Sequence, residues 1–160
     1  MDAATLEEIL DLARRAPSSM NGQPWRFVIV RHADVKDALA NIKNAYCPPE
    51  KREYSADFLR RAPVIVAVCV DTERSWGREI ETGVLAAGYL MLAATGRGLG
   101  SVYLTAYQSG EPRVAGEIRR ALRLTEAVQP IALIPLGYAD GVPPEKTLRP
   151  LSAMVSHVES

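Results

Sequence analysis

The sequence predicts an α+β fold in which one β-sheet lies between helices, as in an α/β sandwich. Helical and strand patterns alternate along residues 5–139, which is the order expected of such a layered fold. Three runs of largely apolar residues have the length and the β-branched content of buried strands. The chain has 160 residues, enough for one hydrophobic core and too few for two. We therefore expect residues 1–160 to form a single domain.

The first half of the chain predicts two helices and two strands. Residues 5–15 form a helical pattern that Pro17 ends; Thr5 and Glu8 fit a capping box, and the apolar stripe consists of Leu6, Ile9, Leu10 and Ala13. The run WRFVIV (25–30) predicts a strand, and Asp34 is placed to cap a short helix after it. KNAYCPPEKREYS (43–55) predicts a loop with room for a short helix after it. PVIVAVCV (63–70) predicts a second, buried strand.

Residues 78–96, REIETGVLAAGYLMLAATG, predict a helix of unusual composition. Between Val84 and Ala94, apolar residues run almost completely around it. A helix that is apolar on all sides has to be buried on all sides. In a chain of this size, a second copy of the same chain is the readiest source of the additional cover. We therefore expect a homodimer; the alternative is a central helix covered entirely by its own chain.

The second half predicts a turn, a helix and a long strand. GRGLG (96–100) follows a helix and not a strand, so it does not fit a dinucleotide-binding fingerprint and predicts a helix end. A short strand-like run follows within GLGSVYLTAY (98–107). Residues 111–124 predict an amphipathic helix with Pro112 in its first turn. The third strand is QPIALIPLGYA (129–139), and a proline-rich tail begins at residue 140.

Composition and charge exclude several classes of function. Lys plus Arg and Asp plus Glu each number 19, so no net field attracts nucleic acid or an anionic membrane. We find no signal peptide or membrane span and expect a cytoplasmic protein that binds neither nucleic acid nor membrane. Cys47 and Cys69 lack metal-ligand spacing, and Cys69 lies in an apolar run where a buried, unreactive thiol is expected. His32 and His157 belong to no metal or nucleophile motif.

The remaining chemistry points to a bound cofactor. The sequence contains no GxSxG, HExxH, CxxC or P-loop motif. A protein without such groups can still catalyse redox reactions, because the cofactor carries the reactive atoms. The stretch APSSMNGQPW offers small hydroxyls, two amides and a rigid ring to a flat heteroaromatic ligand, from Pro17, Ser18, Ser19, Asn21 and Gln23. The alternative is a plain turn between a helix and a strand.

Four blocks of the sequence resemble the flavin-dependent nitroreductase family. They are ARRAPSSMNGQPWRFVIV (13–30), RAPVIVAVCVD (61–71), ETGVLAAGYLMLAATGRGLGS (81–101) and IALIPLGYADGVPPEKTLRPL (131–151). The resemblance spans most of residues 5–155. It implies a mixed sheet flanked by helices and an intertwined homodimer with FMN at the subunit interface. It also implies that NAD(P)H passes hydride to flavin N5, and that a small acceptor such as a nitroaromatic or quinone is then reduced, with no catalytic side chain.

The resemblance also implies the flavin contacts. Pro17, Ser18, Ser19 and Asn21 match a loop that touches the flavin, commonly from the partner subunit, whereas Gln23 contacts the flavin or ties the loop to itself. The backbone of Tyr103, Leu104 and Thr105 matches a stretch that approaches the isoalloxazine edge, where a donor stabilises charge. Lys146 and Arg149 match basic contacts to the phosphate, for which the forked Arg side chain is well suited. Their alternative is ordinary surface charge.

One departure from the family concerns the start of the chain. Family members usually begin earlier, with an Arg-Arg-Ser-x-Arg element that binds the FMN phosphate, and the given sequence opens with MDAATLEEIL. Two alternatives follow: a non-catalytic dimeric module that binds flavin or another ligand, or a chain whose true start lies upstream. Four aromatic residues are candidates for a pocket or for ordinary packing: Tyr46, Tyr54, Phe58 and Tyr107.

Overall fold

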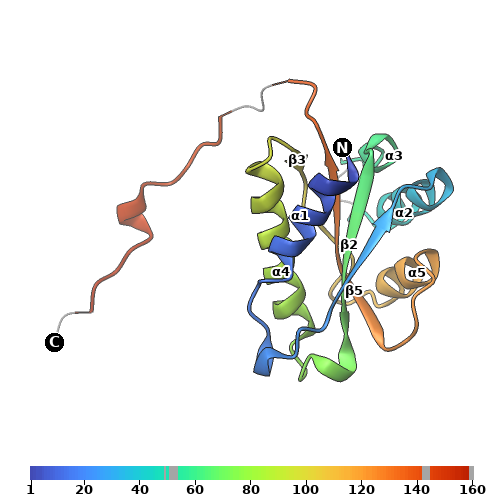
Figure 1. Cartoon of the computed structure of the whole chain (residues 1–160), viewed down its shortest axis with the longest axis horizontal. Coiled ribbons are helices and arrows are strands. Elements are labelled where there is room, and N and C mark those ends of the chain that lie inside the picture. Colours follow the sequence, from blue (N-terminus) through green and yellow to red (C-terminus); the bar gives the residue numbers. More distant parts are fainter. Residues whose placement is uncertain (49, 51–53, 142–144, 159–160) are drawn as a thin grey trace.

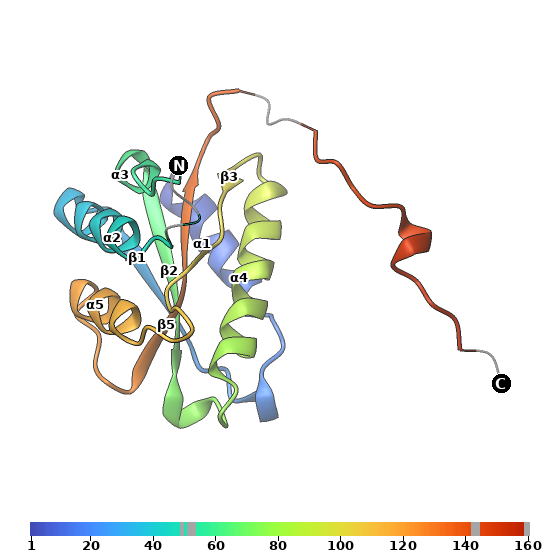
Figure 2. The ribbon, with the colours of Figure 1, turned by 180° about the vertical axis from the view of Figure 1, so that it is seen from behind.

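The computed structural model describes residues 1–48, 50, 54–141 and 145–158 and contains one sheet between two layers of helices (Figures 1 and 2). The strands are β1 (Trp25–Val30), β2 (Val64–Asp71), β3 (Gly100–Ser101), β4 (Leu104–Thr105) and β5 (Val128–Gly137). The helices are α1 (Ala3–Ala13), α2 (Ala33–Ala45), α3 (Phe58–Arg61), α4 (Glu79–Thr95) and α5 (Arg113–Ala121). Short 3-10 turns are η1 (Ser19–Asn21), η3 (Thr72–Arg74) and η4 (Leu151–Ala153).

The α+β sandwich is confirmed, but its strand pairing differs from the mixed pairing expected. The strand order is β1-β2-β5-β3, with β4 also paired to β5, and each of these pairs is antiparallel. The reason lies in the connections. The described part of the connection from β1 to β2 includes α2 and α3, and the chain returns to the end of the sheet where β1 stopped, since Val30 at the end of β1 lies opposite Ile65 near the start of β2; β2 therefore runs in the opposite direction.

Alternate residues of the strands build two cores. On one face Val64, Val66 and Val68 of β2 pack with α1 and α4. On the other face Ile65 and Cys69 pack with α2, α3 and α5. A strand with helices on both faces has to be apolar throughout, which explains the unbroken apolar runs of β2 and β5. The expectation of a buried Cys69 is confirmed: the residue is fully buried, and burial raises the pKa of its thiol to about 12.

Some predicted caps and boundaries were wrong. The Asp2 carboxylate, and not Thr5, caps α1, because it accepts a hydrogen bond from the Thr5 backbone N–H at 2.7 Å. The helix α2 begins after His32, which places Asp34 inside its first turn. The end of α4 at Gly96 agrees with the predicted turn. Residues 49 and 51–53 of the predicted loop, and 142–144 of the predicted tail, lie outside the described residues.

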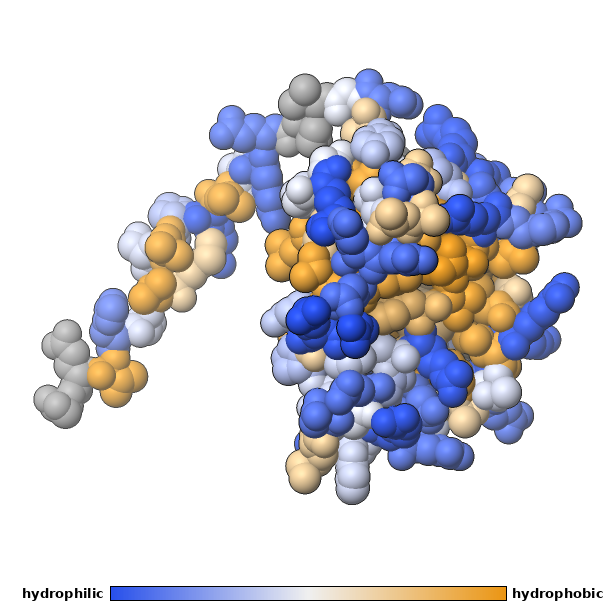
Figure 3. Space-filling model, in the orientation of Figure 1, coloured by the Kyte–Doolittle hydropathy of each residue, from blue (hydrophilic) through white to orange (hydrophobic). Residues whose placement is uncertain are grey.

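Helix α4 has one buried face and one exposed face. Its inner face packs on the sheet and on α1 through Ala86, Ala87, Leu90, Ala93 and Ala94. Its outer face exposes large apolar side chains to between 39% and 74%, namely Ile80, Val84, Leu85, Tyr89 and Leu92. Figure 3 shows apolar surface on this side of the body. The described residues of this chain therefore do not cover the whole of α4, which was the alternative to a dimer.

Gly83 allows α4 to lie close to the sheet, and we expect Gly83→Ala to destabilise the protein. A Cβ at this position would lie 2.6 Å from Cγ1 of Ile131, a fully buried residue of β5. We expect overpacking of about 1–3 kcal/mol to outweigh the gain in helix propensity. Gly116→Ala in α5 is the matched control, because its Cβ would meet nothing within 4 Å. It should stabilise by about 0.5–1 kcal/mol. Urea unfolding measures both, and a stabilised Gly83→Ala would contradict this packing.

Candidate functional site

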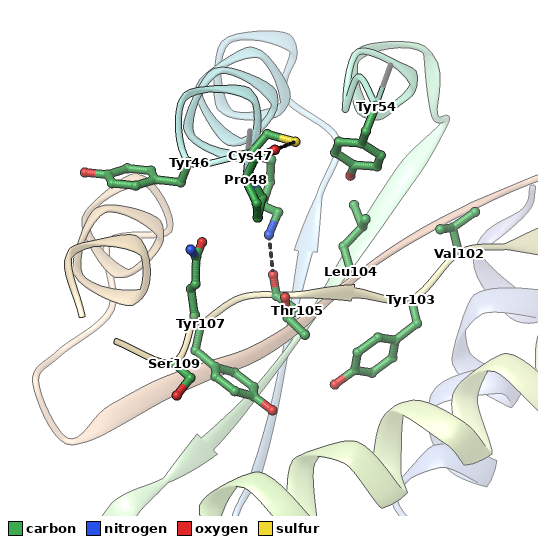
Figure 4. A pocket seen from close by; sticks show the side chains of 12 residues that line it. Tyr46, Cys47, Pro48, Tyr54, Val102, Tyr103, Leu104, Thr105, Tyr107 and Ser109 are labelled. Atoms are coloured by element: carbon green, nitrogen blue, oxygen red, sulfur yellow. Dashed lines mark hydrogen bonds between the residues drawn. The ribbon is translucent and has the colours of Figure 1, made fainter. Parts of the chain in front are cut away.

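A cavity of about 530 Å³ lies at the edge of the sheet where β4 pairs with β5 (Figure 4). This volume is within the range of roughly 300–1,000 Å³ that small-molecule sites occupy. One wall is the segment 102–109, and the other is the end of α2 with the residues that follow it. The lining residues are Lys43, Tyr46, Cys47, Pro48, Tyr54, Val102, Tyr103, Leu104, Thr105, Tyr107, Gln108 and Ser109.

The backbone of β4 presents polar groups away from the sheet. The Ala106 N–H donates to the Ile131 carbonyl at 2.9 Å, and Thr105 lies opposite Ala132. In an antiparallel pair, hydrogen-bonded and non-hydrogen-bonded positions alternate. The N–H and C=O of Thr105 therefore point away from β5. The Lys43 ammonium donates to this carbonyl at 2.9 Å from α2 (dashed line in Figure 4).

Two buried polar atoms lack a hydrogen-bond partner within the described parts of the chain: one belongs to Tyr54, a candidate pocket residue, and the other to a residue beside the predicted loop. Tyr54 Oη is one, and its side chain lines the cavity (Figure 4). The other is Trp25 Nε1, directly after the loop 17–24. Buried polar groups are nearly always paired, so an orphaned one calls for an explanation. A ligand with a polar edge in the cavity would pair with Tyr54.

The phenols of the cavity differ in their surroundings. Tyr46 points away from the cavity and donates to Glu117 Oε1 at 2.7 Å; this hydrogen bond to a carboxylate raises the pKa of Tyr46. Burial raises the pKa of Tyr54 and of Tyr103, so both phenols keep their protons at neutral pH. Tyr103 also packs against the core formed by α1 and α4. These two residues offer the cavity apolar ring surface and neutral hydroxyl donors.

The loop 17–24 is tied to itself. The Gln23 N–H donates to Ser18 Oγ at 3.0 Å, and Gln23 Nε2 donates to Asn21 Oδ1 at 3.2 Å. Gln23 therefore ties the loop together, which is one of the two roles considered for it. Met20, Asn21 and Gln23 have φ values of 49°, 52° and 48°. Left-handed backbone is uncommon outside glycine and accumulates at functional sites.

The predicted site residues lie in three separate places in one chain. Tyr103, Leu104 and Thr105 line the cavity at the β4 edge. The loop with Pro17, Ser18, Ser19, Asn21 and Gln23 leads into β1, at the opposite edge of the sheet. Lys146 and Arg149 are exposed on a tail that leaves the body (Figure 1). The structure therefore brings the first group together and leaves the other two apart from it.

Lys43 is one of the cavity residues that sequence reasoning missed. Its hydrogen bond joins positions 62 residues apart, so no local pattern indicates it. Of the candidate aromatic residues, Tyr46, Tyr54 and Tyr107 line the cavity. Phe58 instead packs into the core beside α2, edge-on to Tyr54 with a centroid distance of 6.5 Å. The described residues contain no helix able to cross a membrane and no group of three metal-ligating side chains.

Known proteins are similar to this chain in sequence and in fold. The family model called Nitroreductase family matches residues 1–138. A Methanothermobacter thermautotrophicus protein, named as an NADH dehydrogenase/NAD(P)H nitroreductase, is 35% identical over 135 residues, which are 83% of this chain and 64% of the relative. An iodotyrosine deiodinase of Thermotoga neapolitana is 31% identical over 85% of this chain and 77% of its own.

A solved structure has a fold similar to that of this chain over nearly its whole length. The FMN-dependent nitroreductase of Clostridium difficile R20291 superposes with a TM-score of 0.75 and 25% identity, over 96% of this chain and 83% of the other. The α/β sandwich of this chain is thus the fold of that nitroreductase. This chain belongs to the nitroreductase family.

Proposed function

We propose that the protein is an FMN-dependent oxidoreductase that takes hydride from NAD(P)H and reduces small acceptors such as nitroaromatics or quinones. The observation that carries this proposal is the cavity beside β4, where the outward-facing N–H and C=O of Thr105 and a Tyr54 hydroxyl without a partner among the described residues adjoin apolar ring surface. A flat ring with a polar edge suits this set of groups. The names of the relatives, which include NAD(P)H nitroreductase and FMN-dependent nitroreductase, support the same class of reaction.

The proposed cofactor contacts come from two chains. In the cavity, the backbone of Tyr103, Leu104 and Thr105 would meet the edge of the FMN ring. The loop containing Pro17, Ser18, Ser19, Asn21 and Gln23 would close the cavity from the partner subunit, since its own chain holds it at the other edge of the sheet. Lys146 and Arg149 on the tail would contact the phosphate, where Arg can donate two parallel hydrogen bonds.

A homodimer would cover the exposed apolar surface of each chain and bring the loop and tail of the partner subunit to its cavity. The outer face of α4 exposes five large apolar side chains, an arrangement typical of an interface. The tail extends from the body, and its Leu148, Leu151 and Val158 are exposed to between 71% and 101%. A second copy would cover both surfaces. Such an interface is isologous, so each copy would give its loop and tail to the other and receive the same in return.

When bound, FMN would supply the hydride-transfer chemistry, and the protein would supply binding and orientation. The Thr105 N–H would stabilise charge that develops at the ring edge, as preorganised backbone donors do. Tyr103 and Tyr54 would exclude water from the ring while keeping neutral hydroxyls in reach. The shape of the cavity would hold the flavin ring in contact with NAD(P)H or with the acceptor, and this is the main contribution expected of the chain.

Binding of FMN is the direct test of this proposal. We expect the purified protein to bind FMN with a Kd of about 1 µM or lower, corresponding to roughly −8 kcal/mol. Flavin fluorescence measures this binding, and NADH should bleach the bound flavin in the absence of oxygen. Asn21→Gly, which tolerates the left-handed backbone and removes the amide, should weaken binding about tenfold. If the protein binds no FMN at 100 µM, a concentration a hundredfold above that Kd, the proposal is contradicted.

A further inference from the structure

Two lysines of α2 make the same kind of contact in different places. Lys36 Nζ donates to the Ala62 carbonyl and Lys43 Nζ donates to the Thr105 carbonyl, both at 2.9 Å. They are seven residues apart, which is about two helical turns. Lys43 lines the cavity, whereas Lys36 is not among the lining residues. The chain thus contains a natural comparison between a lysine at the cavity and one outside it.

The contact of Lys43 holds a short strand. The strand β4 consists of Leu104 and Thr105 alone, and β5 pairs with it on one side. The ammonium group holds the other side, since the Thr105 carbonyl points away from β5. A hydrogen bond from a charged donor is about twice as strong as one between neutral groups. Lys43 therefore limits the rotation of the peptide group that joins Thr105 to Ala106, whose carbonyl accepts from Lys43 and whose N–H donates to the Ile131 carbonyl of β5.

The same contact places a positive charge on the cavity wall. Uptake of a hydride adds two electrons and one proton to a ring, so its charge becomes more negative by one. A nearby cation favours the more negative form, and this preference is strengthened where protein displaces water. Charge near the ring is one of the means by which a protein tunes a redox cofactor.

We propose that Lys43 is a positioning residue that orients the Thr105 peptide and, through its charge, favours the reduced form of the bound flavin. This inference rests on the proposed FMN site. It predicts two separate effects of Lys43→Met. The reduced flavin should lose at least tenfold in affinity relative to the oxidised flavin, which for a two-electron couple lowers the midpoint potential by about 30 mV. The backbone N–H of Ala106, which belongs to the same peptide group as the Thr105 carbonyl and donates to Ile131, should exchange with solvent at least tenfold faster in the cofactor-free protein.

Matched variants separate this role from general stability. Lys36→Met removes an equivalent contact outside the cavity and should leave both measurements within threefold of the wild type. Lys43→Arg keeps a charged donor and should restore both. A potential unchanged in Lys43→Met, an Ala106 exchange rate unchanged in it, or equal effects of Lys36→Met would overturn the proposal. If the wild type binds no FMN, the proposed function fails, while the exchange measurement still decides whether Lys43 orients the strand.

Discussion

Leu85→Glu should convert the protein from a dimer to a monomer and weaken FMN binding by at least a hundredfold. Leu85 lies on the outer face of α4 and is 42% exposed in the single chain. In the proposed dimer this position would be buried, and burial of an unpaired carboxylate in an apolar interface would raise the free energy of the dimer by several kcal/mol. FMN binding should fall in parallel, because each cavity would lose the loop of the partner. Sedimentation velocity gives the mass in solution, and flavin fluorescence gives the affinity.

The control for this variant adds the same charge elsewhere. Ala33→Glu places a carboxylate on an exposed position at the start of α2, in the other helical layer. It should leave both the dimer and the FMN affinity unchanged, because a negative charge is favourable near a helix N-terminus. A wild-type protein that is monomeric at micromolar concentration, or a Leu85→Glu variant that remains dimeric, would rule out α4 as the interface.

Tyr54→Phe should stabilise the cofactor-free protein and weaken FMN binding. The buried Tyr54 hydroxyl has no hydrogen-bond partner among the described residues. An unpaired buried polar group is unfavourable by about 1–3 kcal/mol, so its removal should raise the free energy of unfolding by about that amount. With FMN bound, the hydroxyl would be paired, and its loss should lower the affinity about tenfold. Urea unfolding without FMN and fluorescence titration with FMN measure the two effects.

The opposite signs distinguish a ligand contact from a packing role. Tyr46→Phe is the comparison, because the Tyr46 hydroxyl is already paired with Glu117 at 2.7 Å. That variant should lose about 0.5–1.5 kcal/mol of stability and retain FMN affinity. If Tyr54→Phe destabilises the cofactor-free protein, the hydroxyl has a partner there. If it stabilises the protein and leaves FMN binding unchanged, Tyr54 is no part of the flavin site.

The fold could be predicted because its strongest signals are local. The strands β2 and β5 are buried on both faces, and this burial appears in the sequence as unbroken apolar runs. The turn after α4 could also be recognised from its glycines. The N-caps were harder, because Asp2 and Thr5 are both good capping residues and lie three positions apart. Spacing alone does not determine which of the two residues is the N-cap of α1.

The candidate site was predictable in part. The segment Tyr103–Thr105, for which the resemblance implied contact with the flavin edge, lines a cavity, whereas the loop around Asn21 leads into β1 at the other edge of the sheet. Nothing local indicated Lys43, because its contact with Thr105 depends on how α2 packs beside β4. The Tyr54 hydroxyl lacks a partner in the described part of the chain, and this too is a property of its surroundings and not of its sequence position.

Sequence patterns by themselves determined the order of helices and strands, the double-sided burial of the central strands and the membership of the nitroreductase family. These features are encoded in short segments, because the residue types of each segment suit its own backbone conformation and burial. Only the tertiary structure decided the antiparallel pairing, the exposed outer face of α4 and the meeting of Lys43, Tyr54 and Thr105 around one cavity. Those features are distances between residues far apart in the chain, and such distances exist only after the helices have packed on the sheet.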